Sequence, residues 1–102
     1  MARPVITVAA REDLLRIFEW ISERSGAERA AAVMRRLNGS LERLAAFPQL
    51  GPAASGLDDG ALRRHSVRPR TVFYRPLAGG GVEILRVFDS RRDVAALLGK
   101  KS

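Results

Sequence analysis

The residues with the clearest capacity for chemistry are eight arginines in the C-terminal half of the chain. A guanidinium group is a planar fork of hydrogen-bond donors that suits carboxylates, phosphates and aromatic faces. Arg91 and Arg92 end the stretch "VEILRVFDSRR", and the next residue, Asp93, is placed to brace either of them. The full set is Arg63, Arg64, Arg68, Arg70, Arg75, Arg86, Arg91 and Arg92. Singly, each is most often a solvated charge; together they predict a binding surface.

The net charge of +7 is confined to the same half of the chain. Residues 1–60 contain eight basic and eight acidic side chains, whereas residues 61–102 contain ten basic and three acidic ones. Sixteen of the 18 cations are arginine, a ratio that a GC-rich coding bias would also produce. Such a bias does not explain the segregation, which indicates a polyanionic or acidic partner at the C-terminal half.

Groups for acid–base chemistry and for metal binding are scarce. His65 is the single histidine, cysteine is absent, and the carboxylates follow no coordinating spacing, so we expect no metal site and no cofactor. "GGG" at 79–81 lacks the context of a phosphate loop and is interpreted as a turn. Asp89 ends the last predicted strand, where surrounding arginines would depress the pKa of its carboxyl group and make it a poor acid.

The length and composition predict one small domain spanning residues 1–102. A chain of 102 residues supports a single modest core, and the absence of cysteine fits a reducing compartment. "VITVAA" is too short an apolar run for a signal peptide or a membrane span. We therefore expect a soluble, cytoplasmic protein with no membrane partner.

The pattern of elements predicts an α+β fold in the order β-α-α-β-β-β. Ser25 and Glu28 have the spacing of a capping box between the two helices, and Phe47–Pro48 ends the second helix. Short connections between the last three strands imply a small, mainly antiparallel sheet with the helical hairpin on one face. The predicted strands are 4–8, 62–67, 71–75 and 81–89. The first predicted helix is 9–24, and the second follows it and ends at Phe47. Residues 48–60 are predicted to form a loop and residues 91–98 a short helical turn or tail.

Apolar periodicity predicts the faces that these elements bury. Helical spacing places two stripes toward the sheet: Leu14, Ile17, Phe18 and Ile21, and then Ala30, Met34, Leu37, Leu41 and Leu44. Alternation in the last strand places Val82, Ile84, Arg86 and Phe88 on one face and Glu83, Leu85, Val87 and Asp89 on the other. The hairpin covers only one face, so the other either awaits a partner or is covered within the chain.

The chain resembles the ParE/RelE superfamily of type II toxin–antitoxin toxins. The resemblance rests on the order of elements, on "PQLG" after the second helix, on "SVRPRTVFYRP", and above all on "VEILRVFDSRRDV". The segment "FYR" at 73–75 is similar to half of the family's "Y-R-x-x-Y-R" pattern, and Arg86, Val87, Arg92 and Asp93 match "R-V-x-H-x-x-R-D". The match departs at Asp89, where that pattern has histidine.

The resemblance implies two targets and a third, inactive possibility. RelE-like members are ribosome-dependent mRNA endonucleases with a proton-transferring or stacking group near the last strand, whereas ParE-like members poison DNA gyrase. Because Asp89 replaces the histidine and no tyrosine or histidine follows Tyr74, we favour a ParE-like toxin that binds gyrase and is not an enzyme. The alternatives are a RelE-like mRNase acting on the ribosome and mRNA, and an inactive relative that only binds its antitoxin.

The resemblance also implies where the partners bind. A cognate antitoxin would lay an acidic C-terminal segment across the sheet, its apolar side chains on the strand and its acidic groups on arginines. The residues expected to bind it are Arg75, Val82, Ile84, Arg86, Phe88, Arg91 and Arg92. No catalytic residue is expected; if the chain were a nuclease, the set would be Arg75, Arg86, Asp89 and Arg92.

Overall fold

The computed structural model describes residues 3–54 and 61–89 and contains two helices and a four-stranded sheet. The predicted tail at 91–98 and the residues Arg91 and Arg92 lie outside the described residues. In chain order the elements are β1 (Val5–Ile6), α1 (Val8–Ser25), α2 (Ala27–Ala46), β2 (Arg63–Val67), β3 (Arg70–Pro76) and β4 (Val82–Asp89). The predicted α+β order β-α-α-β-β-β is confirmed.

The first strand is shorter than predicted because a helix cap follows it at once. Thr7 is extended, and its Oγ1 accepts a hydrogen bond of 3.1 Å from the backbone N–H of Ala10, which begins α1 at Val8. A threonine in this position satisfies an N–H that the first helical turn leaves without a partner. Only Val5 and Ile6 remain in β1.

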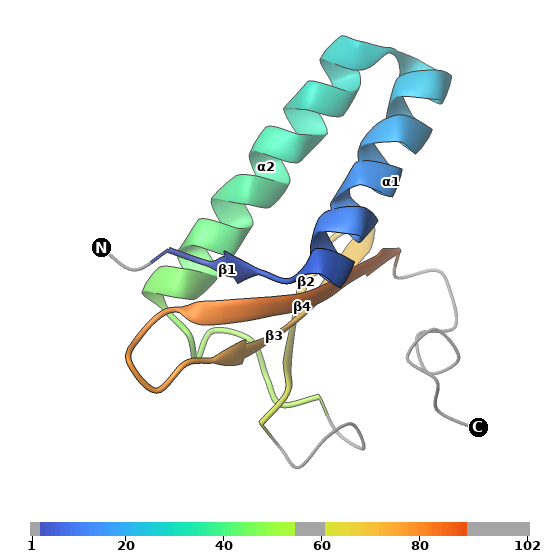
Figure 1. Cartoon of the computed structure of the whole chain (residues 1–102). Helices are drawn as coiled ribbons and strands as arrows, with labels where there is room; N and C mark the ends of the chain where they lie inside the picture. Colours follow the sequence, from blue (N-terminus) through green and yellow to red (C-terminus); the bar gives the residue numbers. More distant parts are fainter. Residues whose placement is uncertain (1–2, 55–60, 90–102) are drawn as a thin grey trace, which may run out of the picture.

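The hairpin turn is made by a glycine and not by the predicted capping box. Ser25 is the last residue of α1, and Gly26 alone separates the helices with φ of +90° and no side-chain cap. A positive φ is readily available only to glycine, which allows this one-residue connection. Figure 1 shows the two helices lying side by side above the sheet.

The sheet has the order β1-β4-β3-β2, with β4 in the interior. β1 pairs with β4 in parallel, and the other two pairs are antiparallel. β3 ends at Pro76, as its missing N–H predicts, and the turn closes with a bond of 3.0 Å from the N–H of Leu77 to the carbonyl of Gly81. The mainly antiparallel sheet is thus confirmed.

A β-bulge overturns the predicted alternation of β4. Phe73 lies opposite Arg86, but the next residue, Tyr74, lies opposite Ile84, so Leu85 is left without a residue facing it on β3. One extra residue in a strand exchanges the faces of everything beyond it. The prediction that Ile84 and Phe88 share a face is therefore wrong: they belong to different apolar clusters on opposite sides of the sheet.

The main core lies between the helical hairpin and the sheet. The stripe on α2 is confirmed, because Leu37, Leu41 and Leu44 are at most 1% exposed. They pack in one cluster with Val72, Tyr74, Val82, Ile84 and Val87. Of the predicted stripe on α1, Leu14 and Ile17 pack in this cluster; Ile21 is buried and Phe18 is partly buried, but neither belongs to it.

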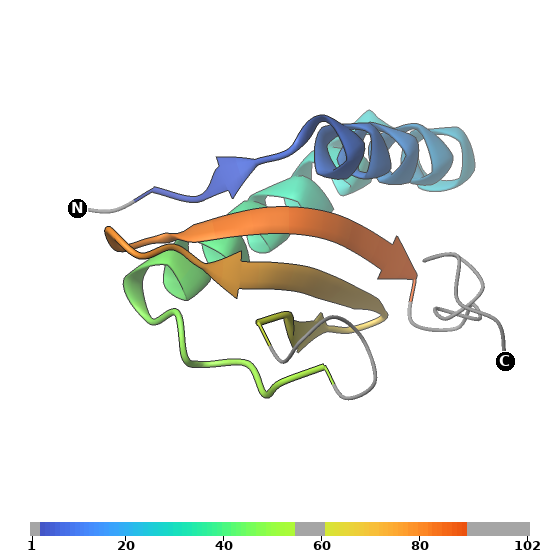
Figure 2. The same ribbon diagram turned by 60° about the horizontal axis from the view of Figure 1, so that its bottom comes forward.

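The other face of the sheet is covered by the chain itself. The segment after α2 turns back along β2 and β3, away from α1 (Figure 2), and its Ala54 packs with Leu62, Phe73 and Phe88 in a second cluster. The rings of Phe73 and Phe88 meet edge to face at 5.9 Å between centroids and are 3% and 5% exposed. The alternative of a doubly covered central strand is therefore correct for this part of the sheet.

No helix within the described ranges is both long enough and apolar enough to cross a lipid bilayer.

Candidate partner-binding site

A buried carboxylate on α1 joins the first helix to the last strand. Asp13 is 4% exposed in its side chain and accepts two bonds from the guanidinium of Arg86, at 2.8 Å from Nε and 2.9 Å from Nη2. Asp13 Oδ2 also accepts the backbone N–H of Val87 at 2.9 Å, and Arg16 Nη2 lies 2.9 Å from Oδ1. Two parallel N–H···O bonds fix both side chains in one geometry.

This network holds both groups in their charged forms. Burial alone would raise the pKa of Asp13, but hydrogen bonds from Arg86 and Val87, with the Arg86 charge and the Arg16 bond, bring it below its ordinary value. The bond to Asp13 raises the pKa of Arg86, against a smaller opposing effect of burial. The pair is therefore fully ionised at neutral pH.

Beyond the end of β1, groups of Thr7 and of Asp13 in α1 bond to the edge of β4 in place of a paired strand. The N–H of Thr7 donates to the carbonyl of Ile84 at 3.2 Å, and Thr7 Oγ1 donates to the carbonyl of Leu85 at 3.1 Å. Asp13 then takes the N–H of Val87. These bonds replace a sheet ladder, so the helix is positioned directly against the strand edge.

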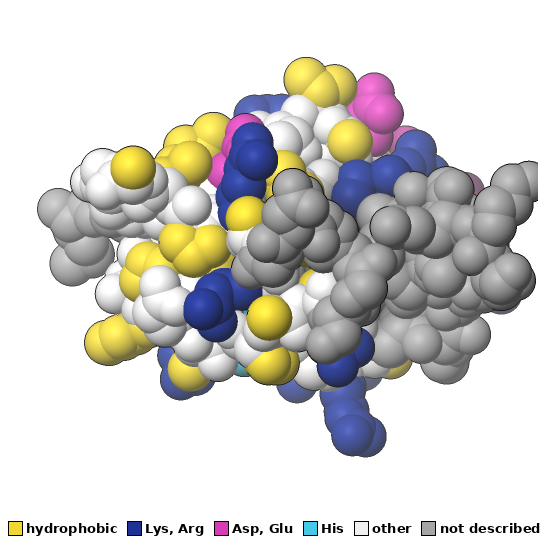
Figure 3. Space-filling view, turned by 90° about the horizontal axis from the view of Figure 1, so that it is seen from below, with side chains coloured by type: hydrophobic (Ala, Val, Ile, Leu, Met, Phe, Trp, Pro, Cys, Tyr) yellow, Lys and Arg dark blue, Asp and Glu magenta, His cyan; other side chains and the backbone are white. Residues whose placement is uncertain are grey.

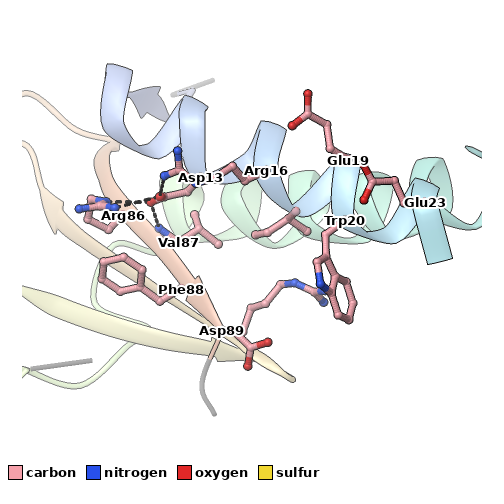
Figure 4. Close-up of a pocket in the computed structure, with 11 residues that line it drawn as sticks. Asp13, Arg16, Glu19, Trp20, Glu23, Arg86, Val87, Phe88 and Asp89 are labelled. Atoms are coloured by element: carbon pink, nitrogen blue, oxygen red, sulfur yellow. Dashed lines mark hydrogen bonds and ion pairs between the residues drawn. The ribbon is translucent and has the colours of Figure 1, made fainter. Parts of the chain in front are cut away.

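Beside this pair lies a groove, which we call the helix–strand groove, with a volume of about 440 Å³. It is lined by Asp13, Arg16, Ile17, Glu19, Trp20 and Glu23 of α1, by Arg70 of β3, and by Arg86, Val87, Phe88 and Asp89 of β4. Figure 4 shows the Trp20 ring on the helix side and the Arg86–Asp13 bonds at the strand side. Trp20 is 46% exposed and carries the guanidinium of Arg24 at 4.3 Å from its ring. The groove thus combines an exposed aromatic ring with charges of both signs.

The structure brings together only some of the residues expected to bind a partner. Arg86 and Phe88 line the helix–strand groove, together with Asp89, which was expected only in the nuclease alternative. Val82 and Ile84 are fully buried beneath the helices, so they support the fold and face no open surface. Their assignment to a contact face is the consequence of the strict alternation that the bulge breaks.

The expected site residue Arg75 lies elsewhere on the sheet. Its guanidinium pairs with Glu83 across the strands, with Nε 2.9 Å and Nη2 2.8 Å from Glu83 Oε1, and its side chain is 48% exposed. An exposed pair of this kind contributes little to stability. Arg91 and Arg92 lie outside the described residues, two and three positions after Asp89.

The sequence reasoning missed the helix side of the site. Asp13, Ile17 and Trp20 are spaced by four and three residues and so share one face of α1. A carboxylate within an apolar stripe is the signal that could have indicated a buried ion pair with an arginine of the sheet. The sequence shows this spacing, but it does not show which arginine Asp13 meets, because that depends on the parallel pairing of β1 with β4.

The described tyrosine and histidine lie apart from the groove. Tyr74 is fully buried, its hydroxyl donates to the carbonyl of Pro48 at 2.9 Å, and it accepts the N–H of Gly51 at 2.8 Å. His65 lies on β2, where burial first and the charge of Arg43 second lower its pKa. Among the described residues, no three His, Asp or Glu side chains converge as metal ligands would.

A two-helix hairpin against a mixed sheet, with a groove between the first helix and the last strand, defines a small α+β domain with a candidate partner-binding site. The family model described as the ParE toxin of type II toxin-antitoxin system, parDE, matches residues 5–94. Toxin ParE3 of Caulobacter vibrioides is 43% identical over 102 residues, which is 100% of both chains. This chain therefore belongs to the ParE toxin family of type II toxin–antitoxin systems, and the predicted resemblance is confirmed.

Further relatives agree with this assignment. Toxin ParE1 of Mycobacterium tuberculosis is 31% identical over 93 residues, covering 91% of this chain and 94% of the relative. Toxin ParE1 of Caulobacter vibrioides is 36% identical over 90 residues, covering 88% and 91%. A chain of the chromosomal ParDE TA system from P. aeruginosa has the same fold, with a TM-score of 0.72, 21% identity, and coverage of 87% of this chain and 96% of that chain.

Proposed function

We propose that this chain inhibits growth by binding and poisoning DNA gyrase, and that a cognate antitoxin neutralises it by occupying the helix–strand groove. The proposal treats the protein as a binder and not as a catalyst. Membership of the ParE family supports the toxin role, and the state of the polar side chains around β4 supports the mode of action.

The single observation that carries the binding mechanism is the ion pair between Arg86 and the buried carboxylate of Asp13. A ribonuclease of the related branch would need its basic side chains for the phosphate and a group that moves a proton. Here the Arg86 guanidinium makes two bonds to a buried carboxylate, and the Tyr74 hydroxyl is held by two backbone groups. Both groups therefore serve the fold, which favours gyrase over mRNA as the target.

The groove supports the antitoxin part of the proposal. Trp20 offers a large exposed ring, a residue type enriched at the centres of protein interfaces. Arg16, whose side chain is 63% exposed, provides positive charge along the same groove for acidic side chains of the antitoxin. An extended or helical antitoxin segment would place apolar side chains on Trp20 and Ile17, and Arg91 and Arg92 would act as further cationic contacts beyond Asp89.

The target is tested by adding the purified chain to two assays in parallel. It should inhibit supercoiling by DNA gyrase and leave mRNA on programmed ribosomes intact, and preincubation with the antitoxin should restore supercoiling. Ribosome-dependent cleavage with no effect on gyrase would show that the nuclease alternative is correct. No effect in either assay, together with tight antitoxin binding, would identify an inactive relative.

The antitoxin site is tested by a pair of substitutions on one helix. Trp20→Ala should weaken antitoxin binding by about 2 kcal/mol or more, the scale of an interface hot spot. The control is Leu15→Ala: Leu15 is also on α1 and is 56% exposed, but it does not line the groove. Equal affinities for both variants in isothermal titration would place the antitoxin elsewhere.

A further inference from the structure

A second groove lies at the opposite edge of the sheet and has a different character. We call it the arginine groove; its volume is about 690 Å³, and it is lined by Pro52, Arg64, His65, Ser66, Arg68, Pro69 and Thr71. β2 is the edge strand of the sheet, and the described bonds from the segment after α2 meet only its start: Ala54 N–H donates to the carbonyl of Leu62, and Arg64 N–H donates to the carbonyl of Pro52. The groove is therefore separate from the helix–strand groove.

The electrostatic character of this edge is positive. The described segment 61–76 contains five arginines and no acidic residue, and none of the described residues that line the groove is Asp or Glu. Two of these arginines are held elsewhere, because Arg63 donates to the carbonyl of Gly51 and Arg75 pairs with Glu83. Arg64 and Arg68 are exposed, and no ion pair joins either of them to another residue of 3–54 or 61–89. Their guanidinium groups face solvent at the groove.

Neighbouring side chains add to the positive potential. Burial and the charge of Arg43, at the C-terminal end of α2, both lower the pKa of His65. The Arg43 charge therefore acts at His65, which lines the groove. The view in Figure 3 agrees, because its lower half shows Lys and Arg side chains and the histidine, with no Asp or Glu among the described residues there.

We propose that the arginine groove binds the phosphate backbone of nucleic acid, with Arg64 and Arg68 contacting phosphates. Backbone binding requires guanidinium and hydroxyl donors and needs no apolar anchor, and the groove offers Arg64, Arg68 and Ser66. This site would act beside gyrase, whose substrate is DNA, but it does not depend on gyrase being the target.

Two other occupants fit the groove less well. A protein partner would need a buried aromatic or aliphatic anchor, and the described residues supply no apolar side chains to the groove except Pro52 and Pro69. A second copy pairing through the edge of β2 would bring Arg64 and Arg68 of the two chains together, and like charges on adjacent strands destabilise a sheet. A polyanion is the partner whose charge complements this surface.

The experiment measures binding of the full chain to two labelled probes by fluorescence anisotropy. The probes are a DNA duplex and an RNA hairpin of unrelated sequence, at salt concentrations from about 50 to about 200 mM. Each phosphate contact on duplex DNA contributes about 0.9 to the salt exponent, so two contacts give an about tenfold loss of affinity over this range. Binding to either probe should be independent of its sequence.

The variant Arg64→Gln/Arg68→Gln should lower the salt exponent by about 2 and weaken binding at least about tenfold at the lowest salt. The matched control is Arg29→Gln/Arg35→Gln, which removes two exposed arginines of α2 and changes the net charge equally. It should bind almost as the wild type does. Circular dichroism melts check folding, and if the double variant unfolds, Arg64→Gln alone should lower the exponent by about 0.9.

Three outcomes would overturn the proposal. Equal losses in the two double variants would show that binding follows net charge alone. An unchanged affinity in Arg64→Gln/Arg68→Gln would place the phosphates elsewhere. Binding of polyglutamate through the same arginines, with neither nucleic acid bound, would identify a site for an acidic protein. None of these outcomes depends on the gyrase assay, so the two proposals succeed or fail separately.

Discussion

Replacing Arg86 by methionine should cost a large part of the stability of the domain. The substitution keeps much of the side-chain volume and removes both bonds to Asp13, whose carboxylate is 4% exposed. Removing one partner of a buried ion pair typically costs about 3–5 kcal/mol. Arg16 and the N–H of Val87 remain bonded to the carboxylate, so we expect about 3 kcal/mol. Small domains have a total of about 5–15 kcal/mol.

The reciprocal change should cost less. Asp13→Asn removes the charge but leaves an amide oxygen that accepts the N–H of Val87, and Arg86, with 29% of its side chain exposed, reaches water. We expect a loss of about 1–3 kcal/mol. The double variant should be more stable than the sum of the two losses predicts, because each single change leaves a partner group behind.

The dependence on pH gives a second, independent signature. In the wild type the pKa of Asp13 is lowered on folding, so its contribution to stability is complete above about pH 4 and is lost as the pH falls through the lower folded value. Without Arg86, fewer groups counteract the effect of burial, so the pKa of Asp13 in the folded state rises. The deficit of Arg86→Met relative to the wild type should therefore shrink as the pH is lowered from about 7 to about 3.

The assay is urea unfolding followed by circular dichroism at several pH values, with the midpoint and slope fitted for each variant. A deficit below about 1 kcal/mol at neutral pH would show that the pair contributes no more than a surface ion pair does. A deficit of constant size between pH 7 and pH 3 would show that the Asp13 carboxylate is not the group that Arg86 stabilises. Either result would refute the reasoning.

Two further predictions concern the segment that follows α2. Tyr74→Phe should lower the free energy of unfolding by about 1–3 kcal/mol, measured in urea, because it leaves the buried carbonyl of Pro48 and N–H of Gly51 without their partner. No loss would mean that water replaces the hydroxyl. Gly51→Ala should also destabilise the domain, because a Cβ there would collide with the backbone carbonyl of Arg64 and lie 2.9 Å from the Tyr74 hydroxyl. Gly79→Ala, whose Cβ would meet nothing within 4 Å, is the control, and equal melting temperatures for both alanine variants would contradict the packing argument.

The fold was predictable from the sequence where one local pattern decides the structure. The apolar seam of α2 has one helical period from Ala30 to Leu44, and packing against a sheet is the way to bury it. The strand boundaries came within two residues because Pro76 and the glycines after it end the pairing. These features depend on near neighbours in the chain.

The site was less predictable because it depends on register between distant segments. The bulge at Leu85 moves Phe88 to the face opposite Ile84, and no residue type near Leu85 predicts a bulge there. The partner of Arg86 is 73 residues away, and only the parallel pairing of β1 beside β4 brings Asp13 to it. The sequence predicts the arginines as one set, whereas the contacts of the described ones divide among the fold, the helix–strand groove and the arginine groove.

The place of β4 in the sheet affects the order in which the protein is made. β4 is the last strand in the sequence, yet it lies between β1 and β3, and it accepts or donates long-range bonds with Thr7 and Asp13. During translation β1 and α1 emerge first, but they have no strand to pair with until residues near 87 have left the ribosome. A nascent chain that stops before β4 lacks both the central ladder and half of the helix–strand groove. The complete sheet can therefore form only after nearly the whole chain has been synthesised.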